Sequence, residues 1–323
     1  MRGTVIGVLR GGPSSEHEVS LATGQAILSN LSDTRFTTRD IYIDKQGTWH
    51  ERGLPTSPER VLPTLDCVLI GLHGEYGEDG TVQRLLDKFG IPYAGSDSFA
   101  SSVAMHKVLT KEKAKEQGLL TPKYYFVEQD GNVESATADI IRTFHQPVVV
   151  KPVSLGSSVG ISIVGGYAPV YQAITSLLPK SGVLIEEVII GREATAGVVE
   201  HLRGEALYHL PPVEIIPPAT SPFFDLAAKY SGETNEIVPG RFTKTETEEL
   251  MRQAGLMHNA LGLRHYSRSD FIVSPKGIYF LETNTLPGLT KESLLPKSLA
   301  SVGVKFEDFI THLVDLSTGE YKK

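Results

Sequence analysis

The first third of the chain alternates short apolar runs with stretches of helical character. Apolar strands are expected in three places, at residues 4–9, 36–43 and 67–72. A helix is expected to begin near Ser15, with Glu16 and Glu18 in its first turn, where the helix dipole favours acidic side chains. This alternation of strands and helices predicts a parallel sheet with helices on both faces. The unit is expected to close around residues 95–97.

The rest of the chain shows further strands and helices. A helix rich in lysine and alanine is expected over residues 101–117, ended by Gly118. Strands are expected next at residues 123–127, 147–152, 160–164, 183–189 and 194–200. The run 211–240 contains six prolines, which favours a long ordered loop over a helix or a strand, and loops of that length are usually functional. Two more helices are expected at residues 244–261 and 305–316.

Residues 268–293 carry the most informative alternation of polar and apolar positions. They are typical of two strands around a tight turn at residues 275–277, with glycine where a three-residue hairpin needs positive φ. A turn centred on the middle residue places Asp270 opposite Glu282, and the two-residue period of a strand puts Asn284 on the same face. The apolar positions between them, on both faces, predict a sheet that is buried on both sides.

Three oxygen-bearing side chains that converge on an apolar surface indicate a cation site. Buried carboxylates so close together would repel each other and shift their pKa values unless a cation held them. Hard oxygen ligands favour magnesium, which is usually shared with nucleotide phosphates. The alternative is an exposed edge hairpin with incidental acids. The apolar flanks favour the metal–phosphate site.

Length and composition limit the classes of protein to consider. A chain of 323 residues is too long for one ordinary core, so two or three subdomains are expected. The formal charge of −7 offers no basic surface for nucleic acid or anionic lipid. The single cysteine, Cys67, lies in an apolar run, which fits a reducing, cytoplasmic compartment. The start is too short for a signal peptide, and no run approaches the roughly 18 apolar residues of a membrane span.

Two glycine-bearing loops follow predicted strands. Residues 11–16 lie where dinucleotide folds hold a pyrophosphate, but the spacing is not GxGxxG and Pro13 removes a backbone donor, so a nicotinamide-dependent oxidoreductase is not supported. Residues 73–80 hold three glycines at the carboxyl end of a strand, which is the usual ligand-binding edge of a parallel sheet. Taken alone, His73 is better explained as a histidine that is hydrogen-bonded within a loop.

Two further segments have the character of a nucleotide site. Lys151 ends a buried strand, where an unpaired ammonium would be costly, so a bound anion is a natural partner. The loop 156–160 can offer backbone N–H groups and hydroxyls to phosphate oxygens, although no P-loop is present. Residues 184–193 place acids at both ends of an apolar segment, where a strand backbone could bond adenine and a carboxylate could bond ribose. Ordinary salt-bridged surface acids explain that segment equally well.

Taken in order, these segments resemble the D-alanine–D-alanine ligases of the ATP-grasp family over nearly the whole chain. Four motifs carry the resemblance, at residues 11–20, 73–80 (HGxxGEDG), 151–160 and 282–288. The resemblance implies an α/β chain of α+β subdomains with the ATP-grasp fold. The implied units are an N-terminal, Rossmann-like parallel-sheet domain at residues 1–97, a central subdomain at 98–185, and a C-terminal subdomain at 186–323 with a lid loop at 223–239.

The resemblance also implies which residues bind ATP and metal, with ATP between the central and C-terminal subdomains. Lys107, Lys151, Ser157 and Lys229 would surround the phosphates, and Glu186, Val188, Ile189 and Glu193 the adenosine. Two magnesium ions, for which manganese could substitute, would be bound by Asp270, Glu282 and Asn284. This agrees with the hairpin geometry reached independently.

The resemblance implies two D-alanine molecules as the other substrates of the reaction, besides ATP. Glu16 would pair with the ammonium of the first, with His73 close to the same molecule. Ser293 and the backbone of Leu294 would take the carboxylate of the second.

A further group of residues would act on the reacting atoms. Arg268 and the Gly288 N–H would stabilise developing negative charge, and Ser157, Tyr230 and Glu16 would form a hydrogen-bonded group. In the implied reaction the first carboxylate attacks the γ-phosphate of ATP, and the second amine displaces phosphate from the resulting acyl phosphate. An acyl phosphate hydrolyses in open water, so a lid is needed. The product would serve peptidoglycan synthesis in the cytoplasm, and the family suggests a homodimer.

Some positions depart from the family pattern. Glu236 stands where many members carry tyrosine, and Glu187 where some carry lysine. Tyr230 supports the dipeptide product, because relatives that make D-alanyl-D-lactate commonly have phenylalanine there. One alternative is the same machinery with D-lactate or D-serine as second substrate. The other is a nucleotide-binding sensor or scaffold without ligase activity, which would not need Glu16, Arg268, Asp270, Glu282, Asn284 and Ser293 together.

Overall fold

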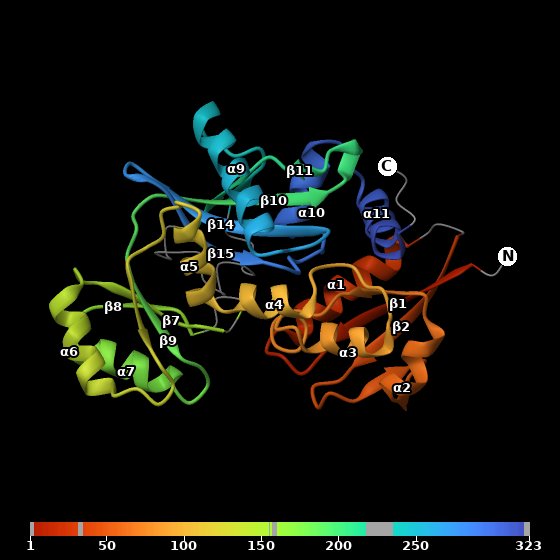
Figure 1. Ribbon diagram of the computed structural model, residues 1–323, viewed down its shortest axis with the longest axis horizontal. Coiled ribbons are helices and arrows are strands. Elements are labelled where there is room, and N and C mark those ends of the chain that lie inside the picture. Colours follow the sequence, from red (N-terminus) through yellow and green to blue (C-terminus); the bar gives the residue numbers. More distant parts are fainter. Residues whose placement is uncertain (1–2, 32–34, 155, 157–159, 218–234, 320–323) are drawn as a thin grey trace.

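The strands of the chain form three sheets (Figure 1). The computed structural model describes residues 3–31, 35–154, 156, 160–217 and 235–319. In the view of Figure 1, the sheet built from residues 4–70 lies at one end of the molecule and the sheet built from residues 124–187 at the other. The third sheet, from residues 192–284, lies between and above them. Within these ranges, no helix combines the length and the apolar surface needed to cross a membrane.

The N-terminal sheet has the parallel centre that the apolar runs predict. Its parallel strands are β1 (Thr4–Gly11), β2 (Phe36–Ile43) and β5 (Cys67–Ile70). An unpredicted antiparallel hairpin, β3 (Trp49–Glu51) and β4 (Leu54–Thr56), extends the sheet beyond β2, so the order is β4-β3-β2-β1-β5. Strands β1 and β5 are almost entirely buried, as parallel strands covered by helices require, whereas only Ile41 and Ile43 are buried in β2.

The helices of this unit include the one that positions the first glycine-bearing loop. They are α1 (His17–Asn30), α2 (Pro58–Val61) and α3 (Thr81–Phe89), with the short 3-10 helix η1 (Leu62–Thr64). Helix α1 begins two residues later than predicted, with Glu16 as its N-cap residue and Glu18 in its first turn. Because Glu16 precedes the first turn, its side chain turns toward a cavity and not along the helix surface.

The single helix predicted over residues 101–117 is wrong. Two helices occupy the segment, α4 (Ser98–Met105) and α5 (Lys107–Glu116). His106 between them has extended backbone angles, and its ring accepts a hydrogen bond from the Leu109 N–H at 3.3 Å as the N-cap of α5. The Lys107 N–H donates to the carbonyl of Val153 at 3.1 Å. This tertiary hydrogen bond replaces a helical one, and composition alone does not reveal it.

The second sheet is antiparallel, in the order β6-β9-β7-β8. Its strands are β6 (Tyr124–Val127), β7 (Val148–Pro152), β8 (Ser162–Val164) and β9 (Val183–Glu187), each slightly shorter than predicted. Two helices that the sequence analysis left unassigned, α6 (Val133–Thr143) and α7 (Tyr167–Leu177), pack on it. Ile140 and Ile174 from these helices are fully buried against Val148 and Val150, which explains the burial of that face.

The third sheet runs β13-β12-β10-β14-β15, with β11 also paired to β10. Its strands are β10 (Arg192–Glu200), β11 (Leu207–His209), β12 (Val213–Ile216), β13 (Asn235–Ile237), β14 (Tyr266–Ser274) and β15 (Gly277–Asn284). Its helices are α9 (Lys244–Ala260), α10 (Leu294–Ser301) and α11 (Phe306–Thr318), with the 3-10 helix η2 (Leu202–Gly204). The helices predicted at 244–261 and 305–316 are confirmed.

The prediction of one long loop over residues 211–240 is wrong at both ends, where β12 and β13 pair with each other. Pro211, Pro212 and Pro217 stand just outside β12, so they remove no ladder hydrogen bond from it. Residues 218–234, which include most of the predicted lid, lie outside the described part of the chain.

The hairpin of β14 and β15 brings Asp270 opposite Glu282, as predicted, but by a different route. Ser274 pairs with Gly277, so the turn holds two residues and not three; Gly277 has the positive φ of 134°. A bulge next to Asp270 then shifts the register by one residue and produces the predicted pair. Burial alternates along both strands, so the prediction of two buried faces is wrong: one face is buried and the other is half-buried.

The three sheets do not follow the predicted domain limits in every detail. Strand β9 runs through the limit between residues 185 and 186. Helices α4 and α5 pack on β15 of the third sheet, where Ala104 and Ala114 share a core with Phe280. The division into 1–97, 98–185 and 186–323 stays a prediction.

Candidate active site

Two cavities meet at the β14–β15 hairpin. One, of about 520 Å³, is lined by the start of α1, the loop after β5, strand β15 and the start of α10. The other, of about 600 Å³, lies between the second and third sheets. Arg268, Glu282 and Leu294 line both cavities. A molecule bound in one cavity therefore lies beside a molecule bound in the other. We call them the hairpin cavity and the inter-sheet cavity.

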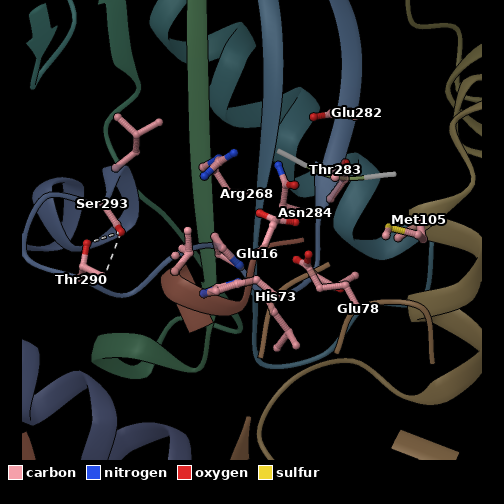
Figure 2. A pocket seen from close by; sticks show the side chains of 18 of the residues that line it. Glu16, His73, Glu78, Met105, Arg268, Glu282, Thr283, Asn284, Thr290 and Ser293 are labelled. Atoms are coloured by element: carbon pink, nitrogen blue, oxygen red, sulfur yellow. Dashed lines mark hydrogen bonds between the residues drawn. The ribbon is translucent and has the colours of Figure 1, made fainter. Parts of the chain in front are cut away.

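The structure brings the predicted site residues together in two groups. The hairpin cavity is lined by Glu16, His73, Lys107, Arg268, Glu282, Asn284, Gly288, Ser293 and Leu294. The inter-sheet cavity is lined by Lys151, Glu186, Val188, Ile189, Glu193, Arg268, Asp270 and Glu282. Figure 2 shows Glu16 beneath Arg268 and Asn284, with Thr290 and Ser293 to one side. Three predicted site residues lie outside the described part of the chain: Ser157, Lys229 and Tyr230.

Asp270 is held by donors from three positions in the sheet. Arg268 binds both of its oxygens, with Nε 3.0 Å from Oδ1 and Nη2 2.9 Å from Oδ2. The Thr195 hydroxyl donates to Oδ1 at 2.6 Å, and the Asn284 amide donates to Oδ2 at 3.1 Å. Register explains the arrangement, because Thr195 pairs with Asp270 across β10 and β14. Thr195 was not among the predicted site residues, since only the pairing of β10 with β14 brings it here.

The predicted metal ligands present the hard oxygen donors that magnesium prefers. Glu282 is the cross-strand partner of Asp270, and Asn284 pairs with Arg268. Protein cations balance the two carboxylates: Arg268 holds Asp270, and Lys107 Nζ lies 3.6 Å from Glu282 Oε2. In the described part of the chain, no three His, Cys, Asp or Glu residues gather closely enough to hold a metal alone. The donors therefore fit magnesium that also takes oxygens from a bound phosphate.

A buried glutamate between two lysines lies beside the inter-sheet cavity. Glu186 Oε2 is 2.8 Å from Lys151 Nζ, and Oε1 is 2.5 Å from Lys111 Nζ. Burial opposes ionisation of Glu186, but attraction to the two ammonium groups outweighs it, so the pKa of Glu186 lies below its ordinary value. Burial lowers the pKa of Lys111 to about 8, although Glu186 opposes this shift. Lys111 was not among the predicted site residues; its i, i+4 spacing from Lys107 on a helix was the available signal.

His73 is fixed beside the hairpin cavity by side chains of the loop and helix that follow β1. Its Nε2 lies 2.7 Å from the Thr23 hydroxyl. Its N–H donates to the Ser20 hydroxyl at 2.9 Å, and its carbonyl accepts from the Ser14 hydroxyl at 2.6 Å. Burial lowers the pKa of His73 to about 4, so the ring is neutral at pH 7. A neutral ring can take part in hydrogen bonds but adds no charge to the cavity.

Glu16 and Glu78 bring two carboxylates into the same cavity. Glu78 accepts a hydrogen bond from the Gly74 N–H at 2.7 Å. Desolvation, with the charge of Glu16 as the next cause, raises the pKa of Glu78 to about 8. A Cβ atom at Gly156 would lie 2.6 Å from Glu16 Oε2, so residue 156 must be glycine for the backbone to approach this carboxylate.

The start of α10 forms another side of the hairpin cavity. Ser293 is the N-cap residue and Leu294 the first residue of this helix. The N–H of Thr290 donates to Ser293 Oγ at 3.1 Å, and the two hydroxyls are 2.8 Å apart (Figure 2). A Cβ atom at Gly288 would lie 2.7 Å from Ser293 Oγ, so the loop folds closely on itself. The first N–H groups of a helix lack intrahelical partners, so this end of α10 can bind a carboxylate.

Family models and solved structures match the whole architecture. The model described as D-ala D-ala ligase C-terminus matches residues 114–315, and D-ala D-ala ligase N-terminus matches residues 5–60 and 55–96. The crystal structure of a D-Ala:D-Ser ligase from Enterococcus faecalis has a TM-score of 0.86 at 29% identity, covering 98% of this chain and 100% of that chain. A Bacillus anthracis D-alanine–D-alanine ligase complexed with ATP has a TM-score of 0.79 at 27% identity, covering 99% and 100%.

Sequence relatives agree with the structural comparison. The D-alanine–D-alanine ligase of Syntrophobacter fumaroxidans is 37% identical over 315 residues, which is 97% of this chain and 97% of that protein. The fold is that of the ATP-grasp ligases, as predicted. The chain belongs to the D-alanine–D-alanine ligase family.

Proposed function

We propose that this protein joins two D-alanine molecules into D-alanyl-D-alanine while it converts ATP into ADP and phosphate. The observation that carries the proposal is the meeting of the two cavities at Arg268 and Glu282. This arrangement allows a phosphoryl group from one cavity to reach a carboxylate in the other. Membership of the family supports the choice of substrates, and the product would supply peptidoglycan synthesis.

ATP occupies the inter-sheet cavity in this proposal. Strand β9 ends at Glu187, so the backbone of Val188 and Ile189 beyond it is available for adenine. Glu193 lines the same cavity and would hold the ribose. Lys151 and Lys107 supply positive charge for the phosphates, with Lys229 and Ser157 as further predicted contacts. Glu186 lies beside the adenosine end and holds Lys151 in place.

Magnesium would be held by Asp270, Glu282 and Asn284, as two ions for which manganese can substitute. Bound there, magnesium supplies positive charge that neutralises the phosphate oxygens during transfer. The fit of the three oxygen donors to this metal supports the proposal. Arg268 keeps the Asp270 carboxylate in a fixed orientation beside the inter-sheet cavity.

The first D-alanine occupies the hairpin cavity. Its ammonium group pairs with Glu16, and His73 lies close to the same molecule. Its carboxylate oxygen attacks the γ-phosphorus of ATP, the bond from that phosphorus to ADP breaks, and an acyl phosphate forms. The deprotonated amine of the second D-alanine then attacks the acyl carbon, and phosphate leaves. Arg268 and the Gly288 N–H would stabilise the negative charge of the tetrahedral intermediate.

The second D-alanine would bind through its carboxylate at Ser293 and the N–H of Leu294, at the start of α10. Both residues line the hairpin cavity, and a helix N-terminus favours an anion. The predicted hydrogen-bonded group of Ser157, Tyr230 and Glu16 would tie the lid to this site.

A second candidate differs only in the second substrate. The similarity to a D-Ala:D-Ser ligase, with its TM-score of 0.86, keeps D-serine open, and D-lactate is the other candidate. Incubation of the protein with ATP, D-alanine and an equal amount of D-serine or D-lactate, followed by mass analysis of the products, separates these possibilities.

We place the protein in the cytoplasm, where ATP is supplied; its one cysteine, Cys67, is buried and unpaired. A homodimer is the expected assembly, which light scattering on the purified protein would test. The proposal involves no nucleic acid and no membrane.

Phosphate release from ATP with magnesium, with and without D-alanine, is the decisive experiment. L-alanine serves as the control, and mass analysis identifies the product. Release that depends on D-alanine, together with D-alanyl-D-alanine, would support the proposal. Binding of ATP without D-alanine-dependent release would overturn it.

A further inference from the structure

Lys111 is a fully buried lysine next to residues that are proposed to bind ATP. Its side chain has 0% exposure, and its Nζ lies 2.5 Å from Glu186 Oε1 and 3.0 Å from the Thr121 hydroxyl. The other Glu186 oxygen is 2.8 Å from Lys151 Nζ. One buried carboxylate is therefore shared by two ammonium groups, one from α5 and one from β7.

The two lysines differ in their access to the inter-sheet cavity. Lys151 and Glu186 line this cavity, whereas Lys111 does not. Lys111 lies behind the carboxylate and is also bonded to Thr121 at the end of the segment that leads into β6. It can therefore act on a bound nucleotide only through Glu186.

The charges of the three groups explain why two lysines are needed. A carboxylate that is 3% exposed is costly to leave without a counter-ion. When Lys151 turns to a phosphate, Glu186 keeps Lys111 as its partner. Without Lys111, the same movement of Lys151 would leave a buried carboxylate unpaired. ATP and Glu186 would then compete for one ammonium group.

We propose that Lys111 is a positioning residue for nucleotide binding, which holds Glu186 so that Lys151 is released to the phosphates of ATP. This inference rests on the proposed function, in which ATP occupies the inter-sheet cavity. Lys107 lies one helical turn earlier on α5 and also forms an ion pair with a glutamate, since its Nζ is 3.6 Å from Glu282 Oε2. Helix α5 thus presents two lysines to two glutamates, and only Lys111 is remote from both cavities.

The test is a double-mutant cycle on nucleotide affinity. Calorimetry with magnesium and a non-hydrolysable ATP analogue would compare wild type, Lys111→Met, Glu186→Gln and the double variant. We expect Lys111→Met to weaken binding about 10-fold or more in the wild-type background, because Glu186 then retains Lys151. In the Glu186→Gln background the same change should cost less than about threefold, because no carboxylate competes.

Steady-state kinetics give a second readout that a general loss of packing would not produce. The KM for ATP should rise with the loss of affinity, while the KM for D-alanine changes less than about twofold. Lys113→Met is the matched control, because Lys113 lies on the same helix and its side chain is 39% exposed, against 0% for Lys111. If Lys111→Met does not fold, Lys111→Gln, which keeps a donor but removes the charge, takes its place in the cycle.

The outcomes separate this inference from the proposed function. Equal weakening in both backgrounds, or no weakening by Lys111→Met, would overturn the role of Lys111 while wild type remained an active ligase. Failure of wild type to bind the analogue, or to release phosphate with D-alanine, would overturn the proposed function and the inference with it.

Discussion

Asp270 and Glu282 face each other across β14 and β15. The two-residue turn alone would set the pairing off by one residue, and the bulge next to Asp270 restores it. The resulting register is the one that a three-residue turn without a bulge would give. The bulge re-aims the last residues of β15, so that Asn284 reaches Asp270 with its amide at 3.1 Å. The geometry of the predicted metal site therefore depends on an irregularity in the strand and not on the turn.

Replacing Glu282 with glutamine should lower kcat roughly 100-fold or more, because the amide keeps the size of the side chain but not its charge for magnesium. The measurement is D-alanine-dependent phosphate release across a range of magnesium concentrations. Glu248→Gln, on the exposed side of α9, is the control and should behave as wild type. Nearly normal kcat in Glu282→Gln would rule out the metal assignment.

Thr195→Val should raise the magnesium concentration for half-maximal activity about 10-fold, because outer partners of metal ligands commonly have effects of that size. The change removes the hydroxyl that donates to Asp270 at 2.6 Å in a buried position. Stability should fall by only about 1 kcal/mol, since the change removes a single hydroxyl donor, which lies near both Asp270 Oδ1 and the Ser269 carbonyl, at similar volume. Thr195→Ser keeps the hydroxyl and should retain the wild-type magnesium dependence. An unchanged dependence in the valine variant would contradict the role of Thr195.

The parts of the fold that could be predicted are those in which local pattern and tertiary structure agree. The apolar runs at β1 and β5 have the composition of strands that are buried on both faces, and they alternate with helical stretches, so the parallel sheet could be inferred. Residue composition did not predict the break at His106, because the Lys107 N–H finds its acceptor in Val153, 46 positions away along the chain (153 − 107).

In the candidate site too, some residues could be predicted from the sequence and others are revealed only by the tertiary structure. Glu16 and His73 could be predicted as site residues because they lie in recurring motifs, and both line the hairpin cavity. Lys111 and Thr195 belong to no glycine loop and to no motif. Lys111 is one of four lysines in α5, and only the packing of that helix shows that this one is fully buried. Thr195 becomes visible only when β10 pairs with β14.

Glu78 should make the stability of the protein fall as the pH rises. Its pKa is raised from 4.5 to about 8, chiefly by desolvation, so the folded state keeps a proton that the unfolded state releases between these values. The stability contribution is complete below pH 4.5 and is lost as the pH rises through about 8, by at most about 1.4 kcal/mol per pH unit. Urea unfolding at pH 5 and pH 8.5 measures the loss.

Glu78→Gln should reduce that loss, because glutamine stays neutral at both values of pH. The exposed neighbour Glu75→Gln is the control and should keep the wild-type dependence. A Glu78→Gln variant that loses as much stability as wild type between pH 5 and pH 8.5 would show that another group causes the change.

Gly156→Ala should weaken D-alanine binding while nucleotide binding is retained. A Cβ atom at this position would lie 2.6 Å from Glu16 Oε2, so the carboxylate that is proposed to hold the first ammonium must move. We expect the KM for D-alanine to rise about 10-fold, the equivalent of one lost charged hydrogen bond, with a smaller change in affinity for an ATP analogue. Gly165→Ala is the control, because its backbone does not need glycine and a Cβ atom there would make only ordinary contacts, the shortest 3.7 Å from the Pro147 Cα atom. A KM for D-alanine equal in both variants would show that Glu16 does not hold the first substrate.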